Sequence, residues 1–100
     1  MSDRLEAFKA MVAKNPKNAL ARFGLANEAM KAGEHALAVE QLQLYLASYD
    51  DEGNGWQRLA ESLTVLGRPE EARTALEKGI AAAERFGHSG MAAEMRETLG

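Results

Sequence analysis

Apolar side chains recur along this chain at intervals of three and four residues, the spacing of one face of an α-helix. The first periodic segment, residues 3–14, places four of them on one expected stripe: Leu5, Phe8, Met11 and Val12. No alternating run rich in Val, Ile and Thr indicates a strand, and no Asn-Gly turn joins two such runs. The pattern therefore predicts an all-α protein.

Short polar breaks divide this pattern into six predicted helices. They span about residues 3–14, 19–31, 34–48, 54–66, 69–85 and 89–99. Gly33 and Gly67 stand in short turns where a positive φ is expected, and Pro69 suits the first position of a helix.

Polar residues at three of the helix starts predict N-caps. Asn18 is expected to cap the second helix. Two pairs resemble a capping box, in which the side chains of a cap residue and of the third residue after it bond each other's backbone. These pairs are Asp3 with Glu6 and Asn54 with Gln57.

The helical pattern repeats after 34 residues. The matching pairs are Leu25/Leu59, Ala26/Ala60, Gly33/Gly67, Ala38/Ala72 and Leu42/Leu76. A helix, a tight turn and a second helix at a fixed period are typical of helical solenoids, in which each pair buries its faces against the next. We therefore expect Ala38 and Ala72 to lie buried where two helices approach closely.

These residues resemble the tetratricopeptide repeat (TPR) family, whose pattern is W-x2-L-G-x2-Y, then A-x3-F, then P. The second repeat reads Trp56-x2-Leu59-Ala60-x2-Leu63, then Ala72-x3-Leu76. The first reads Arg22-x2-Leu25-Ala26-x2-Ala29, then Ala38-x3-Leu42. The chain departs from the pattern at Asp50 and Glu84, where proline is usual, and at Gly79, which interrupts the fifth helix.

The resemblance implies one domain over residues 1–100, an all-α right-handed stack of antiparallel helix pairs. Its expected parts are an N-terminal flanking helix (3–16), repeat units at 19–52 and 53–86, and a C-terminal capping helix (88–99).

For function, the resemblance implies a non-enzymatic scaffold or adaptor that binds a protein or peptide in a concave groove. The side chains that it places on this groove are Leu20, Phe23, Asn27, Met30, Asn54, Gln57, Glu61, Thr64, Met91 and Met95. Phe23 and Glu61 stand where the carboxylate clamp of some members would need Lys or Asn, so no clamp is expected. Two alternatives stay open: the same apolar stripe joins two copies as a homodimer, or these side chains complete the core.

Composition removes several other classes of function. The chain has no cysteine, which excludes disulfides, thiolate nucleophiles and cysteine-ligated zinc. The formal net charge is −3, and the last 51 residues carry ten acidic and six basic side chains, so nucleic acid is not an expected partner. No apolar run approaches the ~20 residues that span a membrane. We expect a soluble, cytoplasmic protein, or a segment excised from a longer one.

Residues that could carry chemistry have simpler structural explanations. His35 and His88 lack further ligands at a metal-like spacing, and Glu70–Glu71 suits the positive end of a helix. The Gly53-x-Gly55 motif lacks the strand and lysine of a phosphate loop, and Asp50–Glu52 lacks the ligand alternation of a calcium loop. We expect residues 50–55 to form a solvated turn, Trp56 to pack in the core, and the protein to need neither metal nor cofactor.

Overall fold

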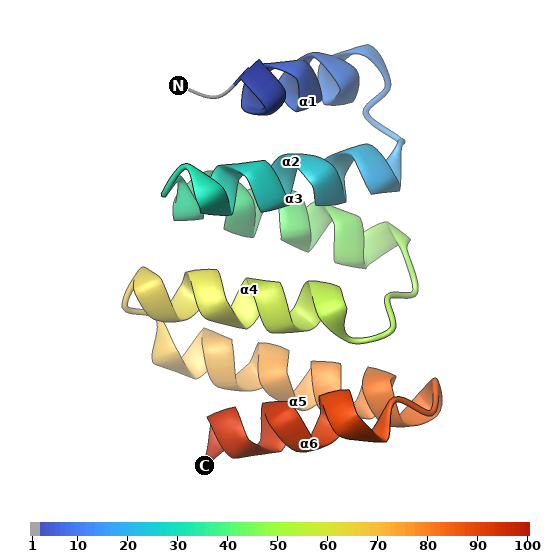
Figure 1. Ribbon diagram of the computed structural model, residues 1–100, viewed down its shortest axis with the longest axis vertical. Helices are drawn as coiled ribbons and strands as arrows, with labels where there is room; N and C mark the ends of the chain where they lie inside the picture. The colour runs from blue at the N-terminus through green and yellow to red at the C-terminus, as the bar shows by residue number, and fades with distance from the viewer. Residues whose placement is uncertain (1–2) are drawn as a thin grey trace. The chain divides into compact units, whose positions relative to one another are not determined.

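The computed structural model describes residues 3–100, which form helices and short connections without any strand (Figure 1). The helices are α1 (Asp3–Lys14), α2 (Ala19–Lys31), α3 (His35–Ser48), α4 (Asn54–Val65), α5 (Pro69–Arg85) and α6 (Ser89–Leu99). The all-α prediction is confirmed. Residues 1 and 2, which the predicted domain includes, lie outside the described part of the chain.

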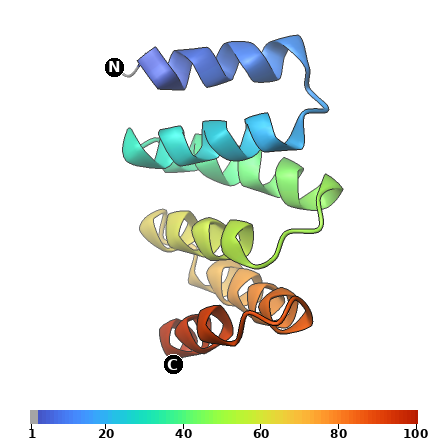
Figure 2. The same ribbon diagram turned by 45° about the vertical axis from the view of Figure 1, so that its right-hand side comes forward.

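The helices group into two compact units, Met1–Tyr49 and Asp50–Gly100. In the first unit α2 packs against both α1 and α3, and in the second α5 packs against both α4 and α6 (Figures 1 and 2). The central helix of each unit therefore joins the other two. The single domain, the repeat limits 19–52 and 53–86, and the flanking segments 3–16 and 88–99 stay predictions.

Glycines close the turns inside both units. Gly33 and Gly67 have φ values of 76° and 73°, which L side chains rarely adopt. After Gly33, the Glu34 N–H donates to the Ala29 carbonyl at 2.8 Å, which is the six-residue bond of a Schellman turn. Gly87 (φ 77°) ends α5 in the same way, with the next N–H donating back into the helix. The positive φ predicted at Gly33 and Gly67 is confirmed.

The caps predicted for α1 and α2 in the first unit have different outcomes. Asn18 Oδ1 accepts a hydrogen bond from the Ala21 N–H at 3.1 Å, so the predicted cap of α2 is confirmed. Asp3 is itself the first helical residue of α1. The capping box predicted for Asp3 and Glu6 is therefore wrong, because a cap residue lies before the helix, and both carboxylates occupy the positive first turn instead.

The start of α4 is capped by Asp51 and not by Asn54. The Asp51 carboxylate accepts hydrogen bonds from the N–H groups of Gly53 and Gly55 at 2.7 and 2.8 Å. Asn54 is already helical, so its predicted capping box with Gln57 is wrong. Asp51 is only 5% exposed. The solvated turn predicted here is therefore wrong at this residue, because both backbone donors draw the carboxylate inward.

The core of the first unit joins all three of its helices. Its members are Leu5, Val12, Ala21, Leu25, Ala29 and Ala38, with Phe8, Met30 and Leu37 packed against them. Phe8 lies over Gly24, where an added Cβ would be 2.2 Å from the ring. Met11 is 46% exposed, so its predicted place on the apolar stripe is wrong. The exposure of Met11 follows from helix geometry, because adjacent residues on a helix point about 100° apart and Val12 faces the core.

The core of the second unit is tightly packed around Gly79, in the middle of α5. A Cβ added there would lie 2.7 Å from Met95 Sδ on α6 and 2.8 Å from Trp56 Cβ on α4. The glycine that departs from the repeat pattern is thus the point where two helices approach a third. Ala72 is 4% exposed and Ala38 of the first unit is fully buried, so the burial predicted for both is confirmed.

Candidate functional site

The predicted groove residues of the first unit lie along one face of α2. Leu20, Phe23, Asn27 and Met30 follow one another at steps of three, four and three residues, which keeps them on one side of the helix. Leu20 is 64% exposed, whereas Phe23 and Asn27 are half-buried. Met30 packs against the core cluster. Leu20 is therefore the most accessible side chain of this face, and Met30 is half-buried like Phe23 and Asn27.

Aromatic stacking with α3 fixes the position of Phe23. Its ring centroid lies 5.0 Å from that of Tyr45, which in turn lies 5.2 Å from that of Tyr49. Tyr45 is buried and Tyr49 is half-exposed. The three rings form a row from α2 to the end of α3, a geometry that favours aromatic pairs. Tyr45 and Tyr49 were not among the predicted site residues, although Tyr49 follows Tyr45 by four residues at the end of a predicted helix, which was a usable signal.

Asn27 has an unsatisfied polar atom on this face. Its Oδ1 is buried and accepts no hydrogen bond within residues 3–100. A buried carbonyl oxygen without a donor is unfavourable by about 1–3 kcal/mol. Asn27 is therefore the residue on this face with unused hydrogen-bonding capacity.

The predicted groove residues on α4 form a polar face. Asn54, Glu61 and Thr64 are exposed, and the Thr64 hydroxyl donates to the Ala60 carbonyl of its own helix at 2.8 Å. Gln57 is half-buried, and its Nε2 donates to Glu94 Oε1 on α6 at 2.7 Å. One of the four side chains is thus held by α6, and the other three remain accessible.

The two methionines of α6 that were predicted on the groove differ in how deeply they are buried. Met95 is completely buried against Gly79, so its predicted place on an accessible groove is wrong. Met91 is half-buried, and its Sδ lies 2.7 Å from where a Cβ of Gly53 would be. Because the two residues are four apart, they share the helix face that docks onto the rest of the unit.

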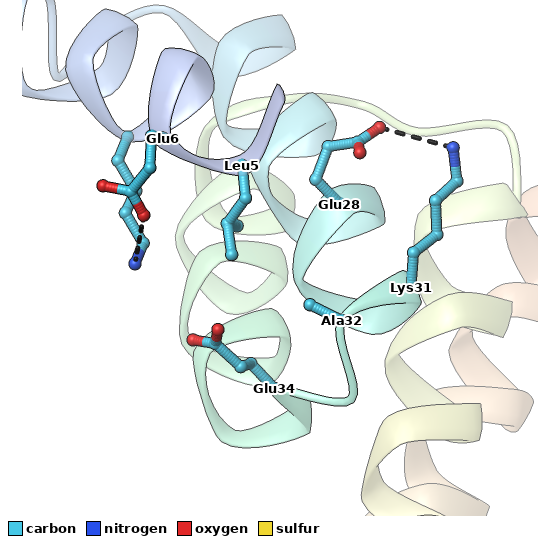
Figure 3. Close-up of a pocket in the computed structure, with 7 residues that line it drawn as sticks. Leu5, Glu6, Glu28, Lys31, Ala32 and Glu34 are labelled. Atoms are coloured by element: carbon cyan, nitrogen blue, oxygen red, sulfur yellow. Dashed lines mark hydrogen bonds and ion pairs between the residues drawn. The ribbon is translucent and has the colours of Figure 1, made fainter. Parts of the chain in front are cut away.

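A separate cleft of about 610 Å³ opens beside α1 and the α2–α3 turn (Figure 3). Its lining residues are Leu5, Glu6, Lys9, Glu28, Lys31, Ala32 and Glu34, none of which belongs to the predicted groove. Most of its charges pair with one another: Glu6 with Lys9, and Glu28 with Lys31. These pairs leave the cleft little free charge with which to bind a ligand.

Glu28 is the buried charged residue of this cleft. Its carboxylate receives hydrogen bonds from Arg4 Nε at 3.2 Å and from Lys31 Nζ at 3.3 Å. Desolvation alone raises the pKa of Glu28, but the two cationic donors act in the opposite direction, and the pKa is lowered overall. Glu28 is therefore ionised at neutral pH and joins α1 to α2.

Comparison with known proteins identifies the family. The family model described as "Tetratricopeptide repeat" matches residues 1–79. A curated protein of Pseudomonas aeruginosa, "TPR repeat-containing protein PA0015", is 34% identical over 91 residues, which cover 91% of this chain and 87% of that protein. The chain belongs to the TPR family. The resemblance inferred from the 34-residue repeat is confirmed.

This TPR chain has Arg22 at the position where the repeat pattern has tryptophan. Arg22 donates through Nε to the Pro16 carbonyl at 3.0 Å and through Nη1 to Gln41 Oε1 at 2.8 Å. Gln41 is buried. Arg22 thus takes the place of the usual tryptophan, and its two hydrogen bonds hold the segment before α2 against α3.

Groups that suggested other chemistry have structural partners in this TPR chain. Glu71 pairs with Arg68, whose hydrogen bond lowers the Glu71 pKa, and His88 contacts Glu52. No group of three or more potential ligand residues within residues 3–100 could hold a metal ion. None of the described helices is both long enough and apolar enough to cross a membrane.

Proposed function

We propose that this TPR chain binds an extended or helical peptide segment of a partner protein on the exposed face of α2. TPR proteins are typically non-enzymatic protein–protein interaction modules, and the family assignment supports the same general role here. The observation that carries the finer proposal is the 64% exposure of Leu20 beside Phe23 and Asn27. An apolar side chain this exposed, next to an aromatic ring, is available to anchor an apolar group of a partner.

The proposed contacts differ between the two units. In the first unit, Leu20 and Phe23 contact an apolar side chain of the peptide, and the Asn27 amide turns to accept a hydrogen bond from a peptide N–H. In the second unit, Asn54, Gln57, Glu61 and Thr64, with the edge of Met91, offer polar contacts. A segment that binds the first unit therefore needs an apolar anchor, and a segment that binds the second unit needs polar or basic residues.

A displayed library of random peptides tests this proposal, because it samples many combinations of apolar and polar side chains. Peptides enriched on the unmodified chain are synthesised, and their affinities are measured by fluorescence anisotropy. The test variant carries Leu20→Ser together with Phe23→Ser. We expect it to bind these peptides at least tenfold more weakly, because two apolar anchors are lost.

The matched control is Leu44→Ser, which removes an exposed leucine (47%) from α3 without touching the α2 face. Circular dichroism establishes that each variant remains helical. Equal affinity of the enriched peptides for the unmodified chain and the double variant would rule out the α2 face as the binding site.

Self-association through the same stripe is the alternative function. Sedimentation equilibrium over a range of concentrations separates the two. If the chain forms dimers that the Leu20→Ser, Phe23→Ser variant does not form, the stripe joins two copies and peptide binding is not its main role.

A further inference from the structure

The outer face of α1 has no covering element among the described residues of the first unit. α1 packs against α2 (Figure 2). Leu5, Phe8 and Val12 turn towards the core on that side. The side away from the core carries the exposed residues Asp3, Glu6, Ala7, Ala10, Ala13 and Lys14, and the exposed Met11 lies at its edge. Four of these, at steps of four, three and four residues, form one straight line along the helix.

The two ends of this line carry opposite charges. Asp3 lies in the first turn and Lys14 in the last. Within residues 3–100 neither has an ion pair, whereas their neighbours Glu6 and Lys9 pair with each other at 3.3 Å. The line between the charged ends contains Ala7 and Ala10, which are small enough to let a second helix approach to about 8 Å.

We propose that this face of α1 binds the same face of a second copy of the chain, with the two helices antiparallel. A two-fold axis between Ala7 and Ala10 places opposite each other the residues whose numbers add up to 17. Asp3 then faces Lys14 of the second copy, and Ala7 faces Ala10 of the second copy. A parallel pair would instead bring Asp3 to Asp3 and Lys14 to Lys14, so the charges select the antiparallel arrangement.

The contact is small, so the dimer is weak. A helix of 12 residues is about 18 Å long, and its paired face buries much less than the roughly 800 Å² per partner of a standard stable interface. Met11, which is 46% exposed, adds apolar area at the edge. The proposed pairing depends on protein concentration and weakens as salt screens the two ion pairs. It uses a different helix from the proposed peptide site on α2, and neither proposal depends on the other.

Charge reversal tests the antiparallel pairing directly. In the proposed dimer, residue 3 of each copy faces residue 14 of the other. Asp3→Lys therefore places lysine opposite lysine at both contacts, and Lys14→Asp places aspartate opposite aspartate. Each variant alone should dimerise roughly tenfold more weakly or worse. An equimolar mixture of the two restores attraction between the variants, so it should dimerise better than either variant alone in sedimentation equilibrium at low salt.

Because each reversal also acts on the helix dipole, melting curves establish that both variants stay folded. Ala10→Arg places a long charged side chain at the centre of the face and should abolish the dimer, while the matched control Ala93→Arg, at an exposed alanine of α6, should leave it unchanged. A mixture that dimerises no better than the separate variants overturns the antiparallel pairing. An unmodified chain that stays monomeric at millimolar concentration overturns the proposal as a whole. The Leu20→Ser, Phe23→Ser variant keeps this dimer if the α1 face forms it and loses the dimer if the α2 stripe does.

Discussion

Substitution of Asp51 by alanine should destabilise this protein far more than the same change at the adjacent Asp50. The Asp51 side chain is buried and accepts two hydrogen bonds at the start of α4, from Gly53 and Gly55. The Asp50 side chain is 71% exposed and pairs with Arg85. Two neighbouring aspartates thus have different structural roles, and their substitutions form a matched pair.

The expected size of the effect follows from these contacts. Loss of an N-cap lowers the free energy of unfolding by about 1 kcal/mol, within a range of about 0.5–2. The alanine also leaves two buried N–H groups without an acceptor, and each such group is unfavourable by about 1–3 kcal/mol unless water reaches it. We expect a total loss of about 2–4 kcal/mol for Asp51→Ala. An exposed ion pair contributes about 0–1 kcal/mol, which bounds the loss for Asp50→Ala.

Urea denaturation followed by circular dichroism measures both free energies of unfolding. Asp51→Asn serves as an intermediate, because the amide oxygen can still accept one of the two hydrogen bonds. We expect the order of stability to be Asp50→Ala, then Asp51→Asn, then Asp51→Ala. A loss below about 0.5 kcal/mol for Asp51→Ala, or equal losses at positions 50 and 51, would refute the capping role.

Further substitutions test the packing and the charge network. Gly79→Ala should lower stability by about 1–2 kcal/mol, because the added Cβ meets Met95 and Trp56. Gly90→Ala has open space around it and should raise stability by up to about 1 kcal/mol. Shifts of the melting temperature with the same sign in both variants would contradict this. Ala38→Leu and Ala72→Leu should each lower stability by about 1–3 kcal/mol, and a neutral effect of both in urea titrations would show that the two sites can expand. Because the pKa of Glu28 is lowered in the folded chain, its ion pairs contribute stability above the ordinary pKa of 4.5, and that contribution is lost as the pH falls from there through the lowered value. In Glu28→Gln this part of the acid dependence should be absent from melts across the acidic range, and an unchanged pH profile would contradict the network.

The sequence alone was sufficient for features that depend on neighbours along the chain. The six helices follow from the spacing of apolar residues, and the turns at Gly33 and Gly67 from the need for a positive φ. Asn18 caps α2 by accepting a hydrogen bond from the N–H of Ala21, three residues later. The 34-residue repeat also placed Ala38 and Ala72 in the core and indicated the TPR family. In each case the deciding interaction lies within one helical turn or repeats at a fixed interval.

The sequence was less informative about which side chains of the predicted groove are accessible. The groove on α2 stays a prediction, whereas Met95, which was predicted on the same groove, is buried against Gly79. Tyr45 and Tyr49, which position Phe23, were not recognised. A helical stripe shows which residues point the same way, but not which of them another helix covers.

The tertiary structure decided those points because they depend on contacts between helices. The sequence predicted the cap of α4 at Asn54, whereas Asp51 caps this helix because the loop before α4 folds inward. Gly79 looked like an interruption of α5, yet α4 and α6 both approach it. The local sequence sets which conformations each segment favours, whereas burial depends on residues distant in the chain, whose positions are fixed only when the helices pack.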